Sequence, residues 1–486
     1  MHFLKPETHT RRAFLRRSGH LAIAGTASPF AMSLAAMSEA AAFNATDYKA
    51  LVCVFLLGGN DYANTVVAYD DANYGKYNAI RAAGAGSASS IALPKTSLAA
   101  TRLEPRTALA GGRQYALHPS MPGLTKLFND GAAAVQLNVG PLVVPLTKVQ
   151  YYSGNTTKYL LPPKLFSHND QQSVWQSSSP EGSTIGWGGN IGDLALSGNT
   201  NSLFTCISLA GNSVYLAGDQ ALQYQCSPSG AVSAKALKNP FFYEPVMRSA
   251  FAELIQQSSS HVLENEYNKV TRRAIAAEAQ VSSGIAGVTL KTPFPGGNSL
   301  AGQLKVVAQL IGAREKLGNK RQVFMVQLGG FDLHDNLISK QPGLMQQVSE
   351  ALSAFYSATV ELGVASSVTS FTASDFGRTL TSNGDGSDHG WGGHHLVVGG
   401  AVNGKSFYGT PPPISVGSTG APDDQWHVGQ GRLLPTTSVD QYAATLAQWF
   451  GVAPTELGGV LPNLRNFGEE GGRPDYPVNL GFLRTV

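Results

Sequence analysis

The sequence has few cysteines and few charged residues. Of its 486 residues only Cys53, Cys206 and Cys226 are cysteines, and charged side chains make up 14%. Three cysteines are too few for a disulfide framework even in an oxidising compartment, which excludes a small disulfide-stapled protein. Cys53 lies in an apolar run and is expected to be buried, whereas Cys206 and Cys226 could pair or remain free.

Beyond residue 42 the chain also lacks an excess of either charge. The formal net charge is +3, and residues 1–42 hold five basic and two acidic residues, a difference of three that accounts for it. A neutral remainder gives no electrostatic reason to expect nucleic acid or an anionic membrane surface as a partner. We therefore expect a small molecule as partner.

No apolar run reaches the ~20 residues that a membrane-spanning helix needs. The stretch Thr10–Arg16 contains Arg11-Arg12 and resembles a twin-arginine export motif, and the weakly apolar stretch 21–36 follows it. Small residues at Ala40–Ala42 suit a signal peptidase. We predict a signal peptide over residues 1–42, the twin-arginine translocase as partner during export, and a periplasmic or secreted mature protein without a membrane span.

Apolar runs alternate with helix-like segments along residues 43–486. Continuous β-branched runs favour strands buried on both faces of a parallel sheet, and their alternation with helices favours a doubly wound α/β fold with helices on both faces. The expected strands are 51–57, 132–139, 323–328, 368–373 and 396–398; the expected helices are 121–130, 245–277, 299–317, 343–362 and 438–450. We predict one domain with rim insertions near 82–116, 141–166, 179–242 and 278–298.

Candidate metal ligands follow three of these strands. Asp61 comes after the Gly58-Gly59 pair, Asp332 and His334 come after Gly329-Gly330, and Asp375 follows the run that ends at 373. In open parallel sheets, ligands bind at the carboxyl edge, where such loops converge. Asp332 and His334 are two apart, so both side chains point the same way in an extended segment.

Imidazoles and carboxylates recur in a later stretch that contains Asp388, His389, His394 and His395. Neutral nitrogen with anionic oxygen is a ligand mix that suits zinc or manganese, and an oxygen-rich loop suits calcium. Adjacent residues in a strand face opposite ways, so at most one of His394 and His395 reaches the ion that His389 reaches. We interpret these groups as one site for one or two divalent ions.

Short motifs in a fixed order extend this interpretation. The chain resembles the domain-of-unknown-function 1501 family of twin-arginine-exported proteins, whose fold is similar to that of alkaline phosphatases and sulfatases. The motifs that carry the resemblance are 57–61, 117–119, 167–170, 330–334, 374–378, 388–390, 431–435 and 461–464. They cover nearly all of the chain after the signal peptide.

The resemblance implies a hydrolase-like site at the carboxyl edge of an alkaline-phosphatase-like fold. By analogy the metal ligands are Asp61, Asp332, His334, Asp375, His389 and one of His394 or His395. Ser167 takes the place of the nucleophile, His168 could protonate the leaving group, and Arg378 could hold an ester oxygen. The family usually has Glu where this chain has Asp375, and Thr where it has Leu333.

Three function classes stay open, of which a redox metalloprotein ranks last because the sequence lacks a Cys-Met-His copper set. The first is an exported metal-dependent hydrolase of phosphate, sulfate or related esters, acting on a small-molecule or glycan ester. The alternative is a non-catalytic member of the same fold that binds a metal or a ligand, or serves in cell-surface assembly.

Overall fold

The computed structural model describes residues 46–82, 90–232, 237 and 245–484, so the expected signal peptide lies outside the described residues. Among the residues it describes, every helix is too short or too polar to cross a membrane.

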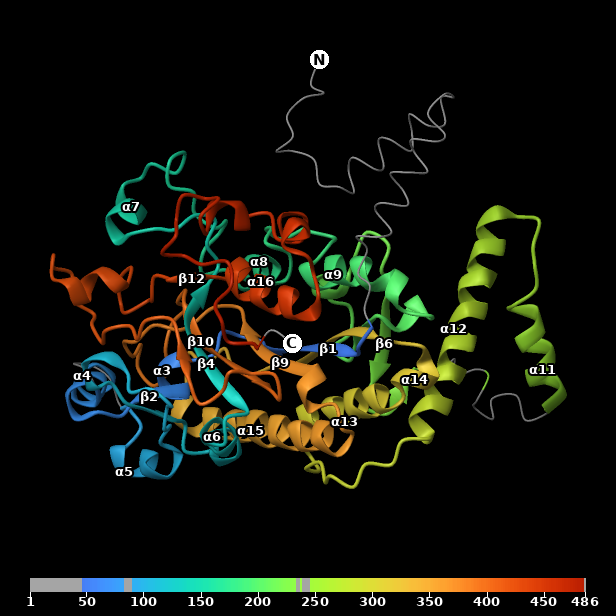
Figure 1. Cartoon of the computed structure of the whole chain (residues 1–486), viewed down its shortest axis with the longest axis horizontal. Helices are drawn as coiled ribbons and strands as arrows, with labels where there is room; N and C mark the ends of the chain where they lie inside the picture. The colour runs from blue at the N-terminus through green and yellow to red at the C-terminus, as the bar shows by residue number, and fades with distance from the viewer. Residues whose placement is uncertain (1–45, 83–89, 233–236, 238–244, 485–486) are drawn as a thin grey trace, which may run out of the picture.

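A central sheet of ten strands runs through the molecule (Figure 1). The spatial order is β11-β4-β10-β9-β1-β8-β5-β6-β7, and β12 pairs with β4. Strands β9, β1, β8, β5 and β6 are parallel neighbours, whereas β10 is antiparallel to both β4 and β9. The bounds are β1 Lys49–Leu56, β4 Ala133–Gly140, β5 Cys206–Ser208, β6 Gln223–Ser227, β7 Gly230–Ala231, β8 Arg321–Leu328, β9 Val368–Ser374, β10 Gly393–Gly399, β11 Phe407–Tyr408 and β12 Thr437–Ser438.

Helices cover both faces of this sheet (Figure 1). On one face lie α6 (Pro122–Asn129), α13 (Ser299–Gly312) and α15 (Leu337–Glu361), and on the other lie α8 (His168–Ser177), α9 (Trp187–Ala195) and α16 (Val439–Phe450). Successive residues of β1 alternate between the two cores: Val52 and Val54 pack on the first face, Cys53 and Phe55 on the second. The predicted doubly wound α/β fold with a mostly parallel sheet is confirmed, and burial on both faces explains its continuous apolar strands.

Two predicted helices are each divided in the structure. The helix expected over 245–277 is two helices, α11 (Pro245–Leu254) and α12 (Val262–Ala286). The break contains three consecutive serines, 258–260, and the hydroxyl of Ser259 bonds the side chain of Glu264 and the backbone N–H of His261. Serine hydroxyls that bond nearby groups compete with helical backbone bonds and favour such a break. The helix expected over 299–317 likewise divides into α13 and α14 (Arg314–Leu317).

The segments interpreted as insertions differ in how they attach. Residues 179–242 contribute β5 and β6, which extend the central sheet beyond β8. Residues 82–116 contain α5 (Lys95–Leu98) and the start of β3 (Tyr115–Leu117), which pairs with β2 (Val66–Ala68) beside α3 (Tyr62–Thr65) and α4 (Asp71–Arg81). Residues 141–166 contain α7 (Lys148–Tyr152), and α17 (Leu457–Val460) follows α16.

All three cysteines are buried and free, so Cys206 and Cys226 do not pair.

Candidate metal centre

Two glycines bring the loop after β1 against the loop after β8. Gly58 has φ +115° and Gly59 has φ +80°, conformations that glycine adopts readily. A Cβ atom on Gly58 would lie 2.3 Å from the backbone nitrogen of Asp332, so a larger residue does not fit. The N–H of Gly58 donates to Oδ1 of Asp375 at 3.1 Å, which ties the loop after β9 to the same place. Loops remote in sequence therefore meet at the carboxyl edge of the sheet.

Four side chains converge at this edge, and we call them the histidine cluster: His168, Asp332, His334 and His389. The Nε2 atoms of His168 and His389 are 3.1 Å apart, and those of His334 and His389 are 2.9 Å apart. Oδ1 of Asp332 lies 3.1 Å from Nε2 of His334 and 3.4 Å from Nε2 of His389, and its Oδ2 lies 3.4 Å from Nε2 of His168. His168, Asp332 and His389 each offer a ligand atom within 4.8 Å of the other two.

The outer nitrogen of each imidazole in the cluster lies beside an oxygen acceptor. The Nδ1–oxygen pairs are His168 with the Asp375 carboxylate (2.6 Å), His389 with the Phe166 carbonyl (2.7 Å) and His334 with the Asp388 carboxylate (3.2 Å). Because these oxygens only accept, each Nδ1 carries a proton and, in the neutral ring, the Nε2 lone pair faces the cluster. Metal-bound histidines are usually oriented in this way.

The electrostatics of the cluster combine a charged carboxylate, Asp332, with two imidazoles, His389 and His168, whose pKa values shift in opposite directions. Burial lowers the pKa of His389 and so favours its neutral form. The hydrogen bond with Asp375 raises the pKa of His168. Burial alone would raise the pKa of Asp332, but the Arg378 guanidinium lowers it overall and keeps the carboxylate charged.

Arg378 and Asp375 are buried behind the cluster and position its members. Nη1 of Arg378 donates to Oδ1 of Asp332 at 2.7 Å and to the carbonyl of Gly58 at 3.1 Å, and its Nη2 donates to the carbonyl of Ser387. These bonds leave Arg378 little capacity for the oxygen of a bound ester. Asp375 accepts from His168 and Gly58, so its carboxylate faces protein donors.

The carbonyl that accepts from Nδ1 of His389 belongs to Phe166, which has an unusual backbone conformation. Phe166 has φ +72° and Lys164 has φ +42°, values that are rare for residues other than glycine and often found at functional sites. The Nε of Arg432 donates to the backbone carbonyl of His389 at 2.7 Å, and its guanidinium lies 5.3 Å above the Phe166 ring. Within the described part of the chain, the two terminal nitrogens of Arg432 have no hydrogen-bond partner.

Ser167 lies next to the cluster, at the N-cap of α8. Its hydroxyl donates to Oδ2 of Asp170 at 2.9 Å rather than capping the helix. Asp170 is buried, and its Oδ1 has no hydrogen-bond partner among the described residues. Nζ of Lys164 lies 3.6 Å from Oδ2 of Asp170. Ser167 thus has a proton acceptor within hydrogen-bond distance, as an activated hydroxyl requires.

Asp61 is not part of the histidine cluster. Its Oδ2 forms a buried ion pair with Arg81 at 2.6 Å and accepts from Ser387 at 2.8 Å, while its Oδ1 caps α3 through the N–H of Asn64. Because all of these partners are protein groups, Asp61 stabilises the packing of this loop.

His394 and His395 lie in the interior on β10. Burial lowers the pKa of each to about 3, so both rings are neutral. Nδ1 of His394 accepts from the N–H of Asn138 at 3.1 Å, and the ring of His395 packs against Trp175 with centroids 4.8 Å apart. The structure brings neither histidine to His389, which comes from the loop before β10.

Three residues of the site were not anticipated from the sequence. Gln172 donates to Oδ2 of Asp375 at 2.8 Å; its position four residues after His168 places both on one face of α8, a signal that was available. Phe166 acts through its carbonyl and its φ, which no side-chain pattern reveals. Arg432 lies in the 431–435 motif, where a lone arginine gives no hint of its neighbours.

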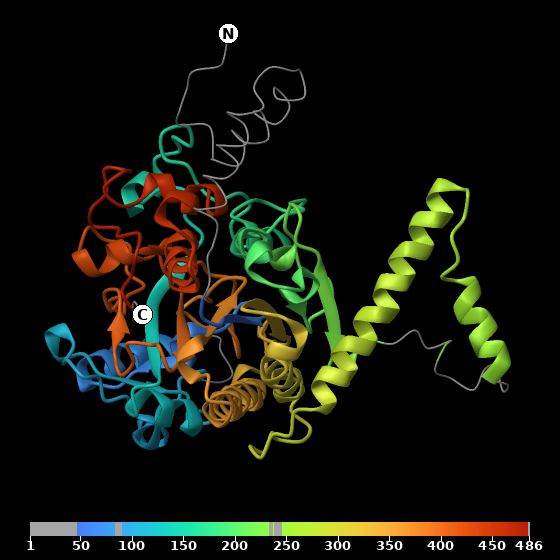
Figure 2. The same cartoon turned by 45° about the vertical axis from the view of Figure 1, so that its right-hand side comes forward.

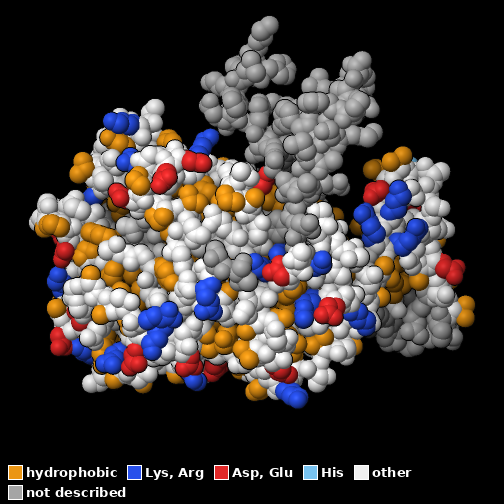
Figure 3. Space-filling view, viewed as in Figure 1, with side chains coloured by type: hydrophobic (Ala, Val, Ile, Leu, Met, Phe, Trp, Pro, Cys, Tyr) orange, Lys and Arg blue, Asp and Glu red, His pale blue; other side chains and the backbone are white. Residues whose placement is uncertain are grey.

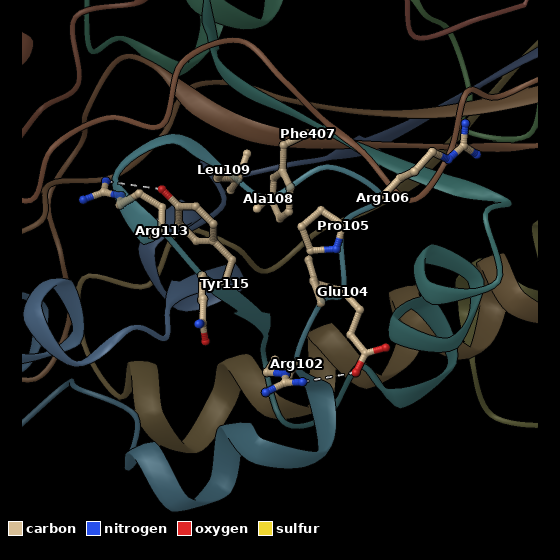
Figure 4. Close-up of a pocket in the computed structure, with 12 residues that line it drawn as sticks. Arg102, Glu104, Pro105, Arg106, Ala108, Leu109, Arg113, Tyr115 and Phe407 are labelled. Carbon is tan, nitrogen blue, oxygen red and sulfur yellow. Dashed lines mark hydrogen bonds and ion pairs between the residues drawn. The ribbon is translucent and has the colours of Figure 1, made fainter.

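A separate hollow of about 520 Å³ lies beside β11 (Figure 4). Its lining includes Tyr115 and Phe407 with Arg102, Arg106 and Arg113 around them. Phe407 pairs with Val135 near the amino end of β4, whereas the histidine cluster lies at the carboxyl edge. The residues lining this hollow include no member of the cluster.

Fold and site together define a doubly wound α/β protein with histidines and an aspartate converging at the carboxyl edge of its sheet. The chain belongs to the family described as Protein of unknown function (DUF1501), whose profile matches residues 48–429. No curated protein matches the chain.

Solved structures with a similar arrangement of elements share little sequence with this chain. One is Ps i-CgsB in complex with k-i-k-neocarrahexaose, at 8% identity and a TM-score of 0.36, covering 89% of this chain and 78% of that one. Another is a protein from the metabolism of multiple glycosaminoglycans by Bacteroides thetaiotaomicron, at 11% identity and a TM-score of 0.33, covering 88% and 75%. Similarity at this level does not identify the activity of this chain.

Proposed function

We propose that this protein is a metal-dependent hydrolase of phosphate, sulfate or related esters that acts after twin-arginine export, in the periplasm or outside the cell. The observation that carries the proposal is the convergence of three Nε2 atoms and the Asp332 carboxylate, with each Nδ1 held from outside. Carboxylates behind ligating histidines are the usual support of a catalytic metal.

The spacing of the donor atoms fits a small divalent ion. Ligands at roughly 2.0–2.2 Å from one tetrahedral zinc ion lie roughly 3.3–3.6 Å from one another. The Nε2–Nε2 and Nε2–Oδ distances in the cluster are 2.9–3.4 Å. His168, Asp332 and His389, whose donor atoms lie within 4.8 Å of one another, would hold the ion, and zinc or manganese fits this set of two nitrogens and a carboxylate better than calcium does. When bound, the ion would stabilise charge on the ester oxygens.

Ser167 is the residue best placed to attack the ester. As its Oγ bonds to phosphorus or sulfur, its proton passes to Asp170, and the bond to the alcohol breaks with the electron pair leaving on the alcohol oxygen. Water then cleaves the Ser167 ester and releases the inorganic anion. His168 has both nitrogens engaged in and behind the cluster, so we assign it to the metal and not to the leaving group.

Arg432 is the residue that would recognise the negative charge of the substrate. Its terminal nitrogens are available, and its position on the Phe166 ring and on the His389 carbonyl fixes the guanidinium beside the cluster. A planar fork of N–H donors matches two oxygens of a phosphate or sulfate group.

The alternative proposal is a metal-binding member of this fold that cleaves no ester. It is favoured by the engagement of Arg378 with Asp332 and Ser387, which removes one cation from substrate recognition. A protein of this class would bind a ligand or take part in cell-surface assembly.

Assays of the metal-loaded protein on aryl phosphates, phosphodiesters and aryl sulfates distinguish the two proposals. We expect Asp332→Ala to abolish turnover and Ser167→Ala to reduce it by at least about a hundredfold. Equal rates for the unmodified protein and both variants would remove the proposed roles. A bound ion without turnover on any ester would favour the non-catalytic alternative.

A further inference from the structure

Helices α11 and α12 form a hairpin that projects from the body of the protein (Figures 1 and 2). The C-terminal part of α12 packs on the domain through Ala277 and Val281, which are buried. The N-terminal part of α12 and all of α11 stand away from it. We call residues 245–275 the arm.

Large apolar side chains are exposed along one stripe of the arm. On α12, Leu263, Tyr267 and Val270 are 76%, 69% and 49% exposed; their spacing of four and three residues places them on one face of the helix. On α11, Met247 and Leu254 lie seven residues apart and are 54% and 57% exposed. Figure 3 shows apolar and basic side chains side by side on this part of the surface. Apolar patches of this kind commonly mark contact surfaces.

The hairpin itself leaves the stripe uncovered. The residues leading from α11 into α12 contact a different face of α12: Asn268 donates to the carbonyl of Gln257 at 2.9 Å, and Arg272 donates to the carbonyl of Gln256. Residues 268 and 272 are four apart and lie on one side of the helix, away from 263, 267 and 270. A second helical layer would therefore fit on the free face.

We propose that the arm pairs with the arm of a second copy of this chain, antiparallel about a two-fold axis, to form a four-helix bundle. Placing Tyr267 opposite Val270 of the second copy also places Leu263 opposite Ala274, which continues the apolar layer. Antiparallel helix pairs with short loops are the usual unit of such bundles. A two-fold axis repeats each contact, so one surface supplies both sides of the interface.

Charge complementarity supports a second copy as the occupant. In the stated register Glu266 of one copy lies beside Arg273 of the other, and the axis makes this pair twice. Within one chain these two side chains already form an ion pair, in which Nη2 of Arg273 lies 3.4 Å from Oε1 of Glu266. Residues 262–275 contain two glutamates against three basic residues, a near balance that favours a matching protein surface over an anionic membrane.

Cysteine cross-linking of the full chain tests the register. For the double variant Tyr267→Cys/Val270→Cys under mild oxidation, we expect most of the protein to run as a disulfide-linked dimer in non-reducing gel electrophoresis. We expect little cross-linking of Ala276→Cys, whose side chain is exposed on another face of α12. Background is low because the three native cysteines are buried. Equal cross-linking of both variants would overturn the proposed register.

Light scattering of the purified protein tests the pairing independently. We expect a mass of about two chains, a dissociation constant raised by about tenfold in Glu266→Arg, and recovery in Glu266→Arg/Arg273→Glu. Val360→Glu, on the exposed side of α15, is the control that leaves the dimer intact. A monomer at every concentration, or recruitment of the arm to anionic vesicles in place of dimers, would overturn the proposal.

Discussion

His168 and His389 face each other through their Nε2 atoms at 3.1 Å, although they are separated by 221 residues in sequence. Each ring is turned to this position by an acceptor behind it, the Asp375 carboxylate for His168 and the Phe166 carbonyl for His389. Two lone pairs that face each other at this distance repel unless a proton or a cation lies between them. A proton or a cation therefore lies between the two rings.

The Asp375 carboxylate, which lies behind His168 and accepts from its Nδ1, gives the first prediction. An amide at position 375 has one acceptor oxygen and one donor nitrogen, so Asp375→Asn cannot accept from Gly58, His168 and Gln172 together. We expect metal affinity to fall by about 10–100-fold with the fold intact. Titration with a chelator measures the affinity; Asp335→Asn, an exposed neighbour, should leave it unchanged. Unchanged affinity in Asp375→Asn would show that this carboxylate does not position His168.

The close approach of two loops gives the second prediction. Gly58→Ala places a Cβ atom against the backbone of Asp332 and should destabilise the protein by at least about 2 kcal/mol. Gly343, in α15, has nothing within 4 Å of its added Cβ, so Gly343→Ala should stabilise by about 0.5–1 kcal/mol. Urea unfolding of both variants provides the test. Similar small effects for the two would contradict the packing described at Gly58.

A buried carboxyl group outside the site gives a pH dependence. Burial in α16 raises the pKa of Asp440 to about 6, against about 3.9 in the unfolded chain. Between about pH 4 and pH 6 the unfolded state loses this proton while the folded state keeps it. The free energy of unfolding should therefore fall as the pH rises through this window, by up to about 3 kcal/mol.

Comparison with Asp440→Asn isolates this contribution, because the amide does not titrate. The difference in unfolding free energy between the protein and this variant should change between about pH 4 and pH 6 and then level off. The exposed Asp423 provides a control substitution, Asp423→Asn, without such a change. Parallel pH profiles for all three proteins would mean that Asp440 ionises normally in the folded state.

Substrate charge gives a fourth prediction. If Arg432 binds the ester anion, Arg432→Gln should raise KM for an aryl phosphate by about tenfold or more, since a charged hydrogen bond contributes about 1.5–3 kcal/mol. Metal content should not change, because Arg432 contacts the His389 carbonyl and the Phe166 ring and no side chain of the histidine cluster. An unaltered KM with full metal content would assign substrate recognition to another group.

Much of the fold could be predicted from local pattern. The run 51–57 is apolar throughout because β1 is buried on both faces, and the glycines after it have the positive φ that the turn requires. The extent of β5 could not be predicted, since a strand of three residues leaves too little pattern to recognise. The break between α11 and α12 was missed because it contains serines and no glycine or proline, the residues that mark a helix end most strongly.

The site was harder to predict than the sheet. Sequence motifs bring Asp332, His334 and His389 into consideration, and the structure places all three in the histidine cluster. His394 and His395 have the same residue type, but their strand continues into the core, and burial rather than motif decides their role. The partners of Arg378 depend on where Asp332 and Ser387 lie after folding, which no spacing along the chain reveals.

Metal content tests the central claim most directly. The folded protein, purified without chelator and then equilibrated with excess zinc or manganese and desalted, is measured by elemental analysis. We predict at least one tightly bound ion per chain, lost in His389→Ala and in Asp332→Ala but retained in His261→Ala, whose imidazole lies at the start of α12. An ion-free protein, or one whose metal content is the same in all three variants, would contradict the account.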